Sequence, residues 1–262
     1  MKTTTFVDQL GRSCHVPFEP KRIISLVPSQ TELLFYFGLN EEVVGITKFC
    51  IHPSRWYREK VRIGGTKQVD FDKISALKPD LIIGNKEENT KEDIEKLEQN
   101  YPVWMSDINS YDDALWMIKS LGSILNRTEQ AAELVSTIVT NFSSLPQQFT
   151  NKKVVYLIWN DPLIAVGKNT YIDSILDKLG LENAIKTSRY PLIEKEKSLE
   201  TDIVFLSSEP YPFKQEHIKQ LSLLFPTAKI RLVDGEMFSW YGSRMKDAPT
   251  YFQEIITELS LP

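Results

Sequence analysis

The sequence predicts an α/β protein of two lobes, in which mainly parallel sheets are flanked by helices. Three observations predict this class. Short apolar strands alternate with helical segments, one helical segment in the middle of the chain contains no strand signal, and the order of elements in the first half returns in the second. At about 150 residues per domain, a chain of 262 residues has room for more than one core.

Composition and charge exclude several function classes. The chain has 31 Lys and Arg against 35 Asp and Glu, a net charge of −4, so no basic excess is available for a nucleic-acid backbone. With 11 Gly and 14 Pro, the sequence is not of low complexity. The most apolar segment, 23–39, contains Pro28 and Glu32 and is too polar to span a membrane.

The first half is predicted to contain repeated strand–helix units. Apolar runs predict buried strands at 22–27, 43–46, 80–84 and 103–106. Ser29 to Glu32 predict a capping box, which starts a helix that ends at Gly38. Thr90 starts a helix through about Gln99 with an acidic first turn, and Ser110 caps the next helix.

The segment 128–145 differs from the rest, because apolar residues at helical spacing continue for about five turns without a strand. Strands are predicted again at 153–159, 163–167, 202–208 and 230–234. KPDLIIGNKEEN before KEDIEKL is echoed by ETDIVFLSSEPY before KQEHIKQL. We therefore predict an N-terminal lobe over 1–126, a connecting helix over 127–148 and a C-terminal lobe over 149–262. The alternative is chance similarity between ordinary strand–helix units.

Aromatic and basic residues gather in the loops that follow the predicted strands, where open α/β sheets bind ligands. The aromatic candidates are Phe49, Trp159, Tyr190, Phe238, Trp240 and Tyr241, and the basic ones are Lys48, Lys67, Lys86, Arg189 and Arg244. In a cleft between two lobes, this lining would suit a large, planar, partly anionic ligand. The alternative for each aromatic residue is packing over the end of a sheet.

Signals for catalysis or a resident metal are weak. The sequence has no G-x-S-x-G elbow, no P-loop and no G-x-G-x-x-G. Cys50 and His52 offer two metal ligands, but no second Cys/His pair completes a closed site, so we predict neither a protein-bound metal nor a cofactor. His217 lies in a charged helical stretch and is expected to be solvated, as are the mixed-sign runs 86–88 and 194–197.

Cysteine content and the N-terminal segment bear on the compartment. Cys14 and Cys50 are compatible with one disulfide or with two reduced thiols. The segment 1–22 has neither the apolar core nor the cleavage site of a secretory signal peptide. The expectation is therefore a cytoplasmic protein if Met1 is the native start, or an exported one whose leader was removed.

Four stretches resemble the substrate-binding proteins of cobalamin and iron-siderophore ABC transporters. They are DQLGRSCHVPFEPKRIISLVPSQTELLFYFGL, GITKFCIHP, IGGTKQVDFDKISALKPDLII and LVDGEMFSWYGSR. The resemblance covers nearly the whole chain. It implies the class III periplasmic-binding-protein architecture of two α/β lobes joined by one long helix, with a bulky metal chelate bound between the lobes. GIT-x-x-C-x-x-P and the W-Y loop look closest to the cobalamin-binding branch.

The resemblance also implies roles for particular residues. Ligand contacts are implied for Phe49, Cys50, His52, Thr66, Lys67, Asn85, Lys86, Trp159, Asn160, Tyr190, Phe238, Trp240, Tyr241 and Arg244. Docking on the ABC transporter membrane subunits is implied for one surface glutamate per lobe, with Glu87, Glu88 or Glu92 as candidates in the first and Glu209 or Glu216 in the second.

The resemblance further implies a monomeric, periplasmic, non-enzymatic protein whose metal arrives inside the chelate. Three alternatives stay open. The first is a ferric-siderophore or haem receptor, the second is a cytoplasmic chelate-modifying enzyme that uses Cys50 and His52, and the third is an interaction protein whose cleft has degenerated.

Overall fold

The computed structural model describes residues 3–146, 152–193 and 199–260. They form two compact units: an N-terminal unit of Met1–Ile108, Asp112–Ile138 and Tyr241–Arg244, and a C-terminal unit of Asn109–Tyr111, Val139–Trp240 and Met245–Pro262. The run 194–197 and the last two residues of the connecting helix predicted over 127–148 lie outside the described residues.

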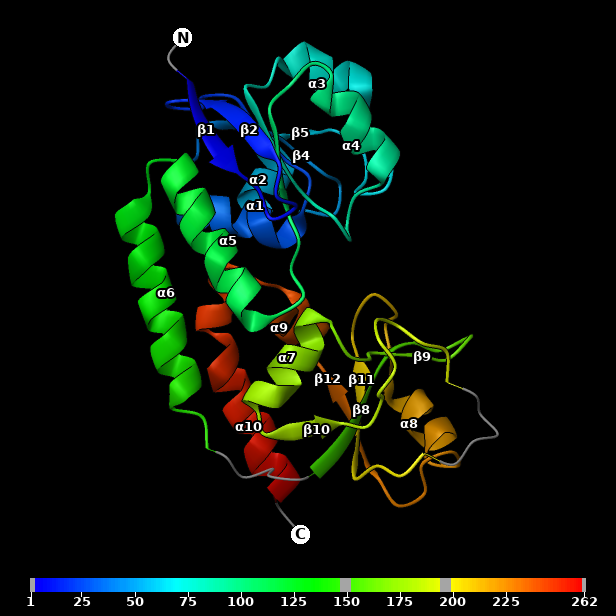
Figure 1. Cartoon of the computed structure of the whole chain (residues 1–262). Helices are drawn as coiled ribbons and strands as arrows, with labels where there is room; N and C mark the ends of the chain where they lie inside the picture. The colour runs from blue at the N-terminus through cyan, green and yellow to red at the C-terminus, as the bar shows by residue number, and fades with distance from the viewer. Residues whose placement is uncertain (1–2, 147–151, 194–198, 261–262) are drawn as a thin grey trace. The chain divides into compact units, whose positions relative to one another are not determined.

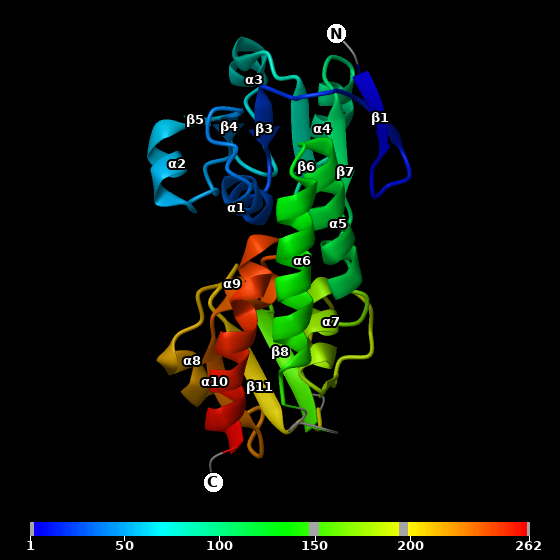
Figure 2. The same ribbon diagram turned by 90° about the vertical axis from the view of Figure 1, so that its left-hand side faces the viewer.

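The N-terminal unit is built on a sheet in which every pairing is parallel. Its strands, in the order β5-β4-β3-β6-β7, are β5 (Val61–Arg62), β4 (Val43–Ile46), β3 (Ile23–Ser25), β6 (Leu81–Asn85) and β7 (Val103–Ser106) (Figure 2). All residues of β3, β6 and β7 are buried. Burial on both faces explains why these strands read as continuous apolar runs.

The helices of this unit are α1 (Pro28–Tyr36), α2 (Ser54–Glu59), α3 (Phe71–Leu77), α4 (Lys91–Glu98) and most of α5 (Tyr111–Ile124). The predicted end of α1 is confirmed, since Gly38 has φ +76°, which favours glycine. The predicted capping box is wrong. The N-cap is Val27, whose apolar side chain cannot accept a hydrogen bond, and Pro28 suits the first turn because its φ is fixed and it lacks an N–H.

The long helix predicted in the middle of the chain is α6 (Thr128–Ser143), drawn as one continuous helix in Figure 2. Its residues up to Ile138 belong to the N-terminal unit, and those from Val139 belong to the C-terminal unit. The chain returns to the N-terminal unit at Tyr241–Arg244. The sequence-based boundaries, with one continuous segment per lobe, do not include this return.

The C-terminal unit has a sheet in the order β10-β8-β11-β12, and β9 also pairs with β8. Its strands are β8 (Lys152–Trp159), β9 (Ile164–Ala165), β10 (Leu181–Asn183), β11 (Ile203–Ser207) and β12 (Lys229–Val233). The pairings are parallel, except that β9 runs antiparallel to β8 and is shorter than the strand predicted over 163–167.

The two faces of this sheet carry different cores. Figures 1 and 2 show α7 (Tyr171–Lys178) and α10 (Ala248–Ser260) on one face and α8 (Gln215–Leu221) on the other. Val155 and Leu157 pack with Leu221 on the α8 side. Tyr156 of the same strand contacts Phe238 of α9 (Gly235–Ser239), with ring centroids 5.1 Å apart. This alternation is the period of a strand buried on both faces.

Two further features complete the fold. Strands β1 (Thr3–Val7) and β2 (Ser13–Pro17) form an antiparallel hairpin that the sequence did not predict. Cys14 and Cys50 are both free and buried, so the reduced-thiol alternative holds. Burial raises the pKa of Cys14 to about 11. Among the described residues, no helix has the length and apolar character needed to span a membrane.

Candidate ligand-binding site

The carboxyl edge of the N-terminal sheet is organised by a buried polar network. The hydroxyl of Ser106, at the end of β7, accepts hydrogen bonds from Gln30 Nε2 at 2.5 Å and Asn85 Nδ2 at 2.9 Å. The backbone N–H of Asn85 in turn donates to Asn89 Oδ1 at 2.9 Å, and Asn89 Nδ2 donates to the carbonyl of Thr66 at 3.0 Å. The network therefore ties together helix α1, the loops that follow β5 and β6, and the end of β7.

Asn85 and Thr66, both predicted as ligand contacts, are buried within this network. Asn85 Oδ1 accepts from the backbone N–H groups of Glu87 and Glu88 at 2.9 and 3.1 Å, which is the geometry of a turn closed by a side chain. The structure thus gives Asn85 a role in shaping the loop that carries Lys86. Lys86 is exposed, and its ammonium pairs with Asp107 at 2.6 Å.

The same edge carries an exposed aromatic residue with one lysine over its ring. Phe49 is 51% exposed, and Lys48 Nζ lies 5.1 Å from the centre of its ring. A Cβ at Gly65 would meet the Phe49 ring at 3.2 Å, so this glycine lets the loop of 64–67 approach the ring closely. Lys67 Nζ donates to the carbonyl of Glu87. The 64–67 loop therefore lies against Phe49 at Gly65 and against the 85–88 loop through Lys67.

Cys50 does not share the exposure of Phe49. Its side chain is 0% exposed, and its sulfur lies 3.1 Å from both Thr31 Oγ1 and Thr47 Oγ1. Burial raises the pKa of the thiol. These contacts assign the side chain to the interior of the unit. Among the described residues, no group of three or more His, Cys, Asp or Glu side chains is placed to hold a metal ion.

In the C-terminal unit, the loops after β8 and β11 form an aromatic cluster, which we define as Trp159, Tyr211, Phe213 and His217. Trp159 is 39% exposed, its Nε1 donates to the carbonyl of Asp161 at 2.9 Å, and its ring stands edge-on to Tyr211 with centroids 5.7 Å apart. Tyr211 packs against Phe213 at 4.8 Å and His217 at 5.4 Å. Sequence reasoning missed Tyr211, although it lies only three residues after the strand VFLSS.

The prediction that His217 is solvated is wrong, because this side chain is only 7% exposed. It occupies the third position of α8 and faces inward. Its Nδ1 accepts from the backbone N–H of Lys214 at 2.8 Å, and its Nε2 lies 3.0 Å from Tyr211 Oη. A side chain at this position that accepts from the N-cap N–H is half of a capping box.

Substitution His217→Ala is expected to lower the free energy of unfolding by about 1–2 kcal/mol, since a helix-capping hydrogen bond is lost. The loss is measured by urea denaturation. Glutamine is a natural residue at this helix position and also accepts from the N-cap N–H, so His217→Gln is expected to lose less. Equal losses for the two variants would contradict the capping role.

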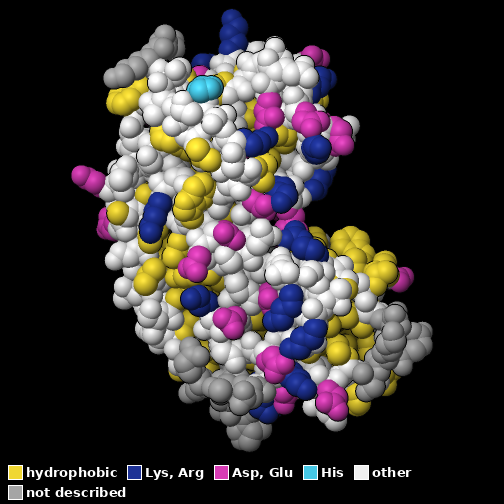
Figure 3. Space-filling view, viewed as in Figure 1, with side chains coloured by type: hydrophobic (Ala, Val, Ile, Leu, Met, Phe, Trp, Pro, Cys, Tyr) yellow, Lys and Arg dark blue, Asp and Glu magenta, His cyan; other side chains and the backbone are white. Residues whose placement is uncertain are grey.

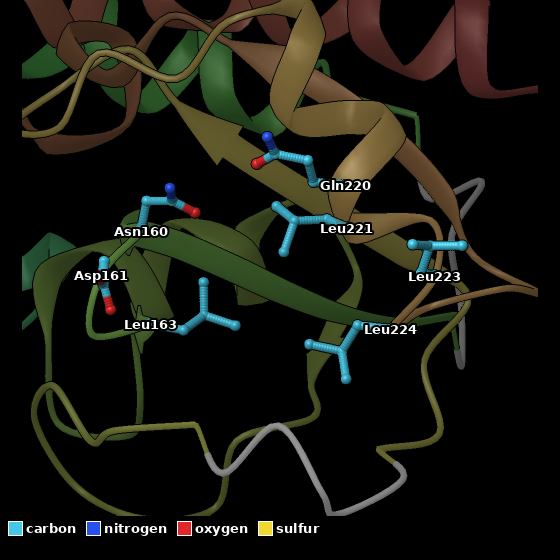
Figure 4. A pocket seen from close by; sticks show the side chains of 7 residues that line it. All are labelled: Asn160, Asp161, Leu163, Gln220, Leu221, Leu223 and Leu224. Carbon is cyan, nitrogen blue, oxygen red and sulfur yellow. The ribbon is translucent and has the colours of Figure 1, made fainter.

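A pocket of about 390 Å³ lies beside this cluster, within the size range of ligand sites. Figure 4 shows the amides of Asn160 and Gln220 on one side of it and Leu223 and Leu224 on the other. Leu163 and Leu221 belong to the core beneath it. The pocket therefore combines apolar walls with a few polar groups. Asn160, a predicted ligand contact, lines it.

The predicted site residues from 238 to 241 lie deeper. Phe238 is 0% exposed and contacts Phe205 at 5.6 Å and Phe252 at 4.7 Å, so its ring is part of the core. Trp240 is buried, and its Nε1 donates to Glu209 Oε1 at 3.1 Å. Ser239 Oγ donates to the same oxygen at 2.5 Å. Tyr241 is also buried.

Glu209, predicted as a transporter-docking residue, thus accepts hydrogen bonds from Ser239 and Trp240 inside its own unit. Burial raises its pKa, and the negative charges of Glu236 and Asp234 act in the same direction. Glu216, the other docking candidate of this unit, is exposed. In the N-terminal unit, Glu87 and Glu92 are exposed and Glu88 is half-buried.

The variant Glu209→Gln is expected to melt at a higher temperature than the wild type at neutral pH. The pKa of Glu209 is higher in the folded than in the unfolded chain. The free energy of unfolding of the wild type therefore falls as the pH rises from the unfolded pKa through the folded pKa. Melting temperatures between about pH 4 and about pH 8 should show the difference between the proteins growing with pH. Glu216→Gln controls for the loss of one charge, and a pH-independent difference would contradict this expectation.

Two arginines of the predicted site make fixed contacts. Arg244 forms a fork with Glu32 of α1, with Nε–Oε2 at 3.0 Å and Nη2–Oε1 at 2.7 Å, inside the N-terminal unit. Arg189 Nη1 donates to Asn109 Oδ1 at 2.7 Å, and its guanidinium lies 5.5 Å from the ring centre of Tyr190. Tyr190 and His52 are half-buried. Basic and acidic side chains are interspersed over the visible faces (Figure 3).

Comparisons with known proteins identify related sequences and structures. Over 192 residues the chain is 25% identical to an uncharacterized ABC transporter substrate-binding lipoprotein, YvrC, of Bacillus subtilis, covering 69% of this chain and 60% of YvrC. It is 24% identical over 178 residues to the vitamin B12-binding protein of Pectobacterium carotovorum, covering 66% and 64%. The chain thus spans less than two thirds of the length of these relatives.

Solved structures show the fold. The petrobactin-binding protein YclQ from Bacillus subtilis matches over 100% of both chains with a TM-score of 0.81 and 16% identity. The predicted two-lobed, class III α/β architecture is confirmed by such neighbours. A family model described as periplasmic binding protein matches residues 23–226. This chain therefore belongs to the periplasmic binding protein family.

Proposed function

We propose that this chain is the substrate-binding component of an ABC importer and that it captures cobalamin or a related metal chelate. The observation that carries the proposal is the exposure of large aromatic side chains at the carboxyl edges of both sheets. These side chains are Phe49, beside Lys48, in the N-terminal unit and Trp159, beside Tyr211, in the C-terminal unit.

Such side chains suit a flat ligand with polar groups at its edge, since an aromatic face binds by stacking and lysines supply donors. The printed names of the relatives support the same class, because they include an ABC transporter substrate-binding lipoprotein and a vitamin B12-binding protein. Thr66, Asn85 and Trp240 act in this proposal by holding loops in place. The proposed ligand contacts that reach the surface are Phe49, His52, Lys67, Lys86, Trp159, Asn160 and Tyr190.

We propose a binding rather than a catalytic role. A chelate-modifying enzyme that used Cys50 would need an accessible thiolate, whereas this thiol is buried and its pKa is raised. The variant Cys50→Ser separates the two roles. If the wild type shows no turnover of the chelate and Cys50→Ser binds the chelate with unchanged affinity, the binding role is supported. If the wild type turns the chelate over and Cys50→Ser does not, the binding role is overturned.

The partners follow from the same proposal. The exposed acids Glu87, Glu92 and Glu216 are the proposed contacts with the transporter membrane subunits. A monomer in the cell envelope fits this role, in line with the lipoprotein among the relatives.

Tryptophan fluorescence titration tests the proposal, because Trp159 lies at the proposed site and is partly exposed. The probes are cyanocobalamin, cobinamide, hemin and a ferric siderophore. We expect saturable quenching by cyanocobalamin at micromolar protein. Quenching by hemin or the siderophore alone would assign the chain to the alternative receptor class, and no binding of any probe would overturn the proposal.

A further inference from the structure

The hydrogen-bonding groups around Tyr211 determine whether its hydroxyl group donates or accepts a hydrogen bond. His217 Nδ1 lies 2.8 Å from the backbone N–H of Lys214. A backbone N–H can only donate, so Nδ1 must carry a lone pair rather than a proton. The neutral imidazole then has its proton on Nε2.

This tautomer makes Tyr211 an acceptor toward His217. The Nε2–H group donates to Tyr211 Oη across 3.0 Å. The hydroxyl hydrogen of Tyr211 must therefore point elsewhere. The amide Nδ2 of Asn160 also directs a donor toward Oη, at 3.5 Å, and a donor cannot accept the hydroxyl hydrogen. That separation is too long for an O–H···O hydrogen bond, whichever way the amide is turned.

Within the part of the chain that the structure describes, the Tyr211 hydroxyl thus keeps a donor hydrogen for another acceptor. Its position is suited to a ligand. Tyr211 is partly exposed and follows β11 at the carboxyl edge of the sheet, and its ring meets the exposed indole of Trp159 at 5.7 Å. Contacts with Phe213 and His217 hold the ring on its other sides, so the hydroxyl oxygen is held in place.

We propose that Tyr211 is a specificity-determining residue whose hydroxyl donates a hydrogen bond to a carbonyl or carboxylate oxygen at the periphery of the chelate, while Trp159 packs on the chelate's flat surface. His217 is a positioning residue that holds this hydroxyl as a donor. The inference rests on the proposed function and narrows it to chelates that carry peripheral oxygen acceptors. A site that holds a fixed donor discriminates against analogues lacking the acceptor, because the donor would then be left unpaired.

The test compares wild type with Tyr211→Phe, which keeps the ring and removes only the hydroxyl. Cyanocobalamin presents amide carbonyls and hemin presents carboxylates, so the probe that binds wild type identifies the kind of oxygen. We expect Tyr211→Phe to raise the Kd of that probe about tenfold, equivalent to about 1.4 kcal/mol. The variant also leaves the buried Nε2–H of His217 without its acceptor, so its melting temperature is measured alongside and binding is compared at a temperature where both proteins are folded. Tyr36→Phe, which removes an exposed hydroxyl from α1 in the other unit, is the matched control.

The possible failures are distinguishable. If wild type binds a probe and Tyr211→Phe binds it equally well, this inference is overturned and the proposed function stands. If wild type binds neither cyanocobalamin nor hemin and no siderophore, both this inference and the proposed function are overturned. The tautomer has a test that needs no ligand: nitrogen NMR of His217 should show a protonated Nε2 and an unprotonated Nδ1. A proton on Nδ1 would overturn the donor assignment even if the tyrosine variant were unstable.

Discussion

Substitution Phe238→Ala is expected to lower the free energy of unfolding by about 3–5 kcal/mol, the range found when a buried phenylalanine is truncated. The ring is fully buried between Tyr156, Phe205 and Phe252, so its removal leaves a cavity with walls from the sheet and from α10. Urea denaturation monitored by circular dichroism gives the loss directly.

Phe49→Ala is the matched control, because it truncates the same kind of side chain at an exposed position. We expect it to change the free energy of unfolding by less than about 0.5 kcal/mol and to weaken cyanocobalamin binding. If Phe238→Ala instead weakened binding and left stability unchanged, the ring would belong to the ligand site that the sequence predicted for it.

Arg244→Met is expected to cost about 2–3 kcal/mol of unfolding free energy. The forked pair with Glu32 has side-chain exposures of 14% and 23%, so removal of the arginine leaves a largely buried carboxylate without its partner. The cost is placed below that of a fully buried pair because water still reaches both groups.

A double-mutant cycle separates the pair from its surroundings. Glu32→Gln combined with Arg244→Met should recover part of the loss, since the stranded charge is gone. A coupling energy below about 0.5 kcal/mol would mean that the pair behaves like an exposed surface salt bridge.

Much of the fold could be predicted because its strands are buried on both faces. Such strands appear in the sequence as uninterrupted apolar runs, as Leu81–Asn85 and Ile203–Ser207 show. The long helix α6 was predictable from its spacing, and the end of α1 from Gly38. The hairpin of β1 and β2 was not, because four of the five residues of β1 are exposed and give no core-facing alternation.

The site was harder to predict, because local composition does not determine which way a side chain points. His217 lies among charged residues, yet its position on α8 turns it toward Tyr211. Cys50 and Phe49 are neighbours in one loop, and only the second reaches the surface. Which of two adjacent residues is exposed depends on packing with Thr31 and Gly65, and both are distant in sequence.

The return of Tyr241–Arg244 to the N-terminal unit limits how far this protein can be treated as modular. A fragment that ended within α6 would contain α1 and Glu32 but not the arginine that neutralises that carboxylate. The complementary fragment would carry that arginine without the carboxylate. A division of the chain at the central helix would therefore separate the two groups of this ion pair, and we expect each fragment to lose the stability that the pair contributes.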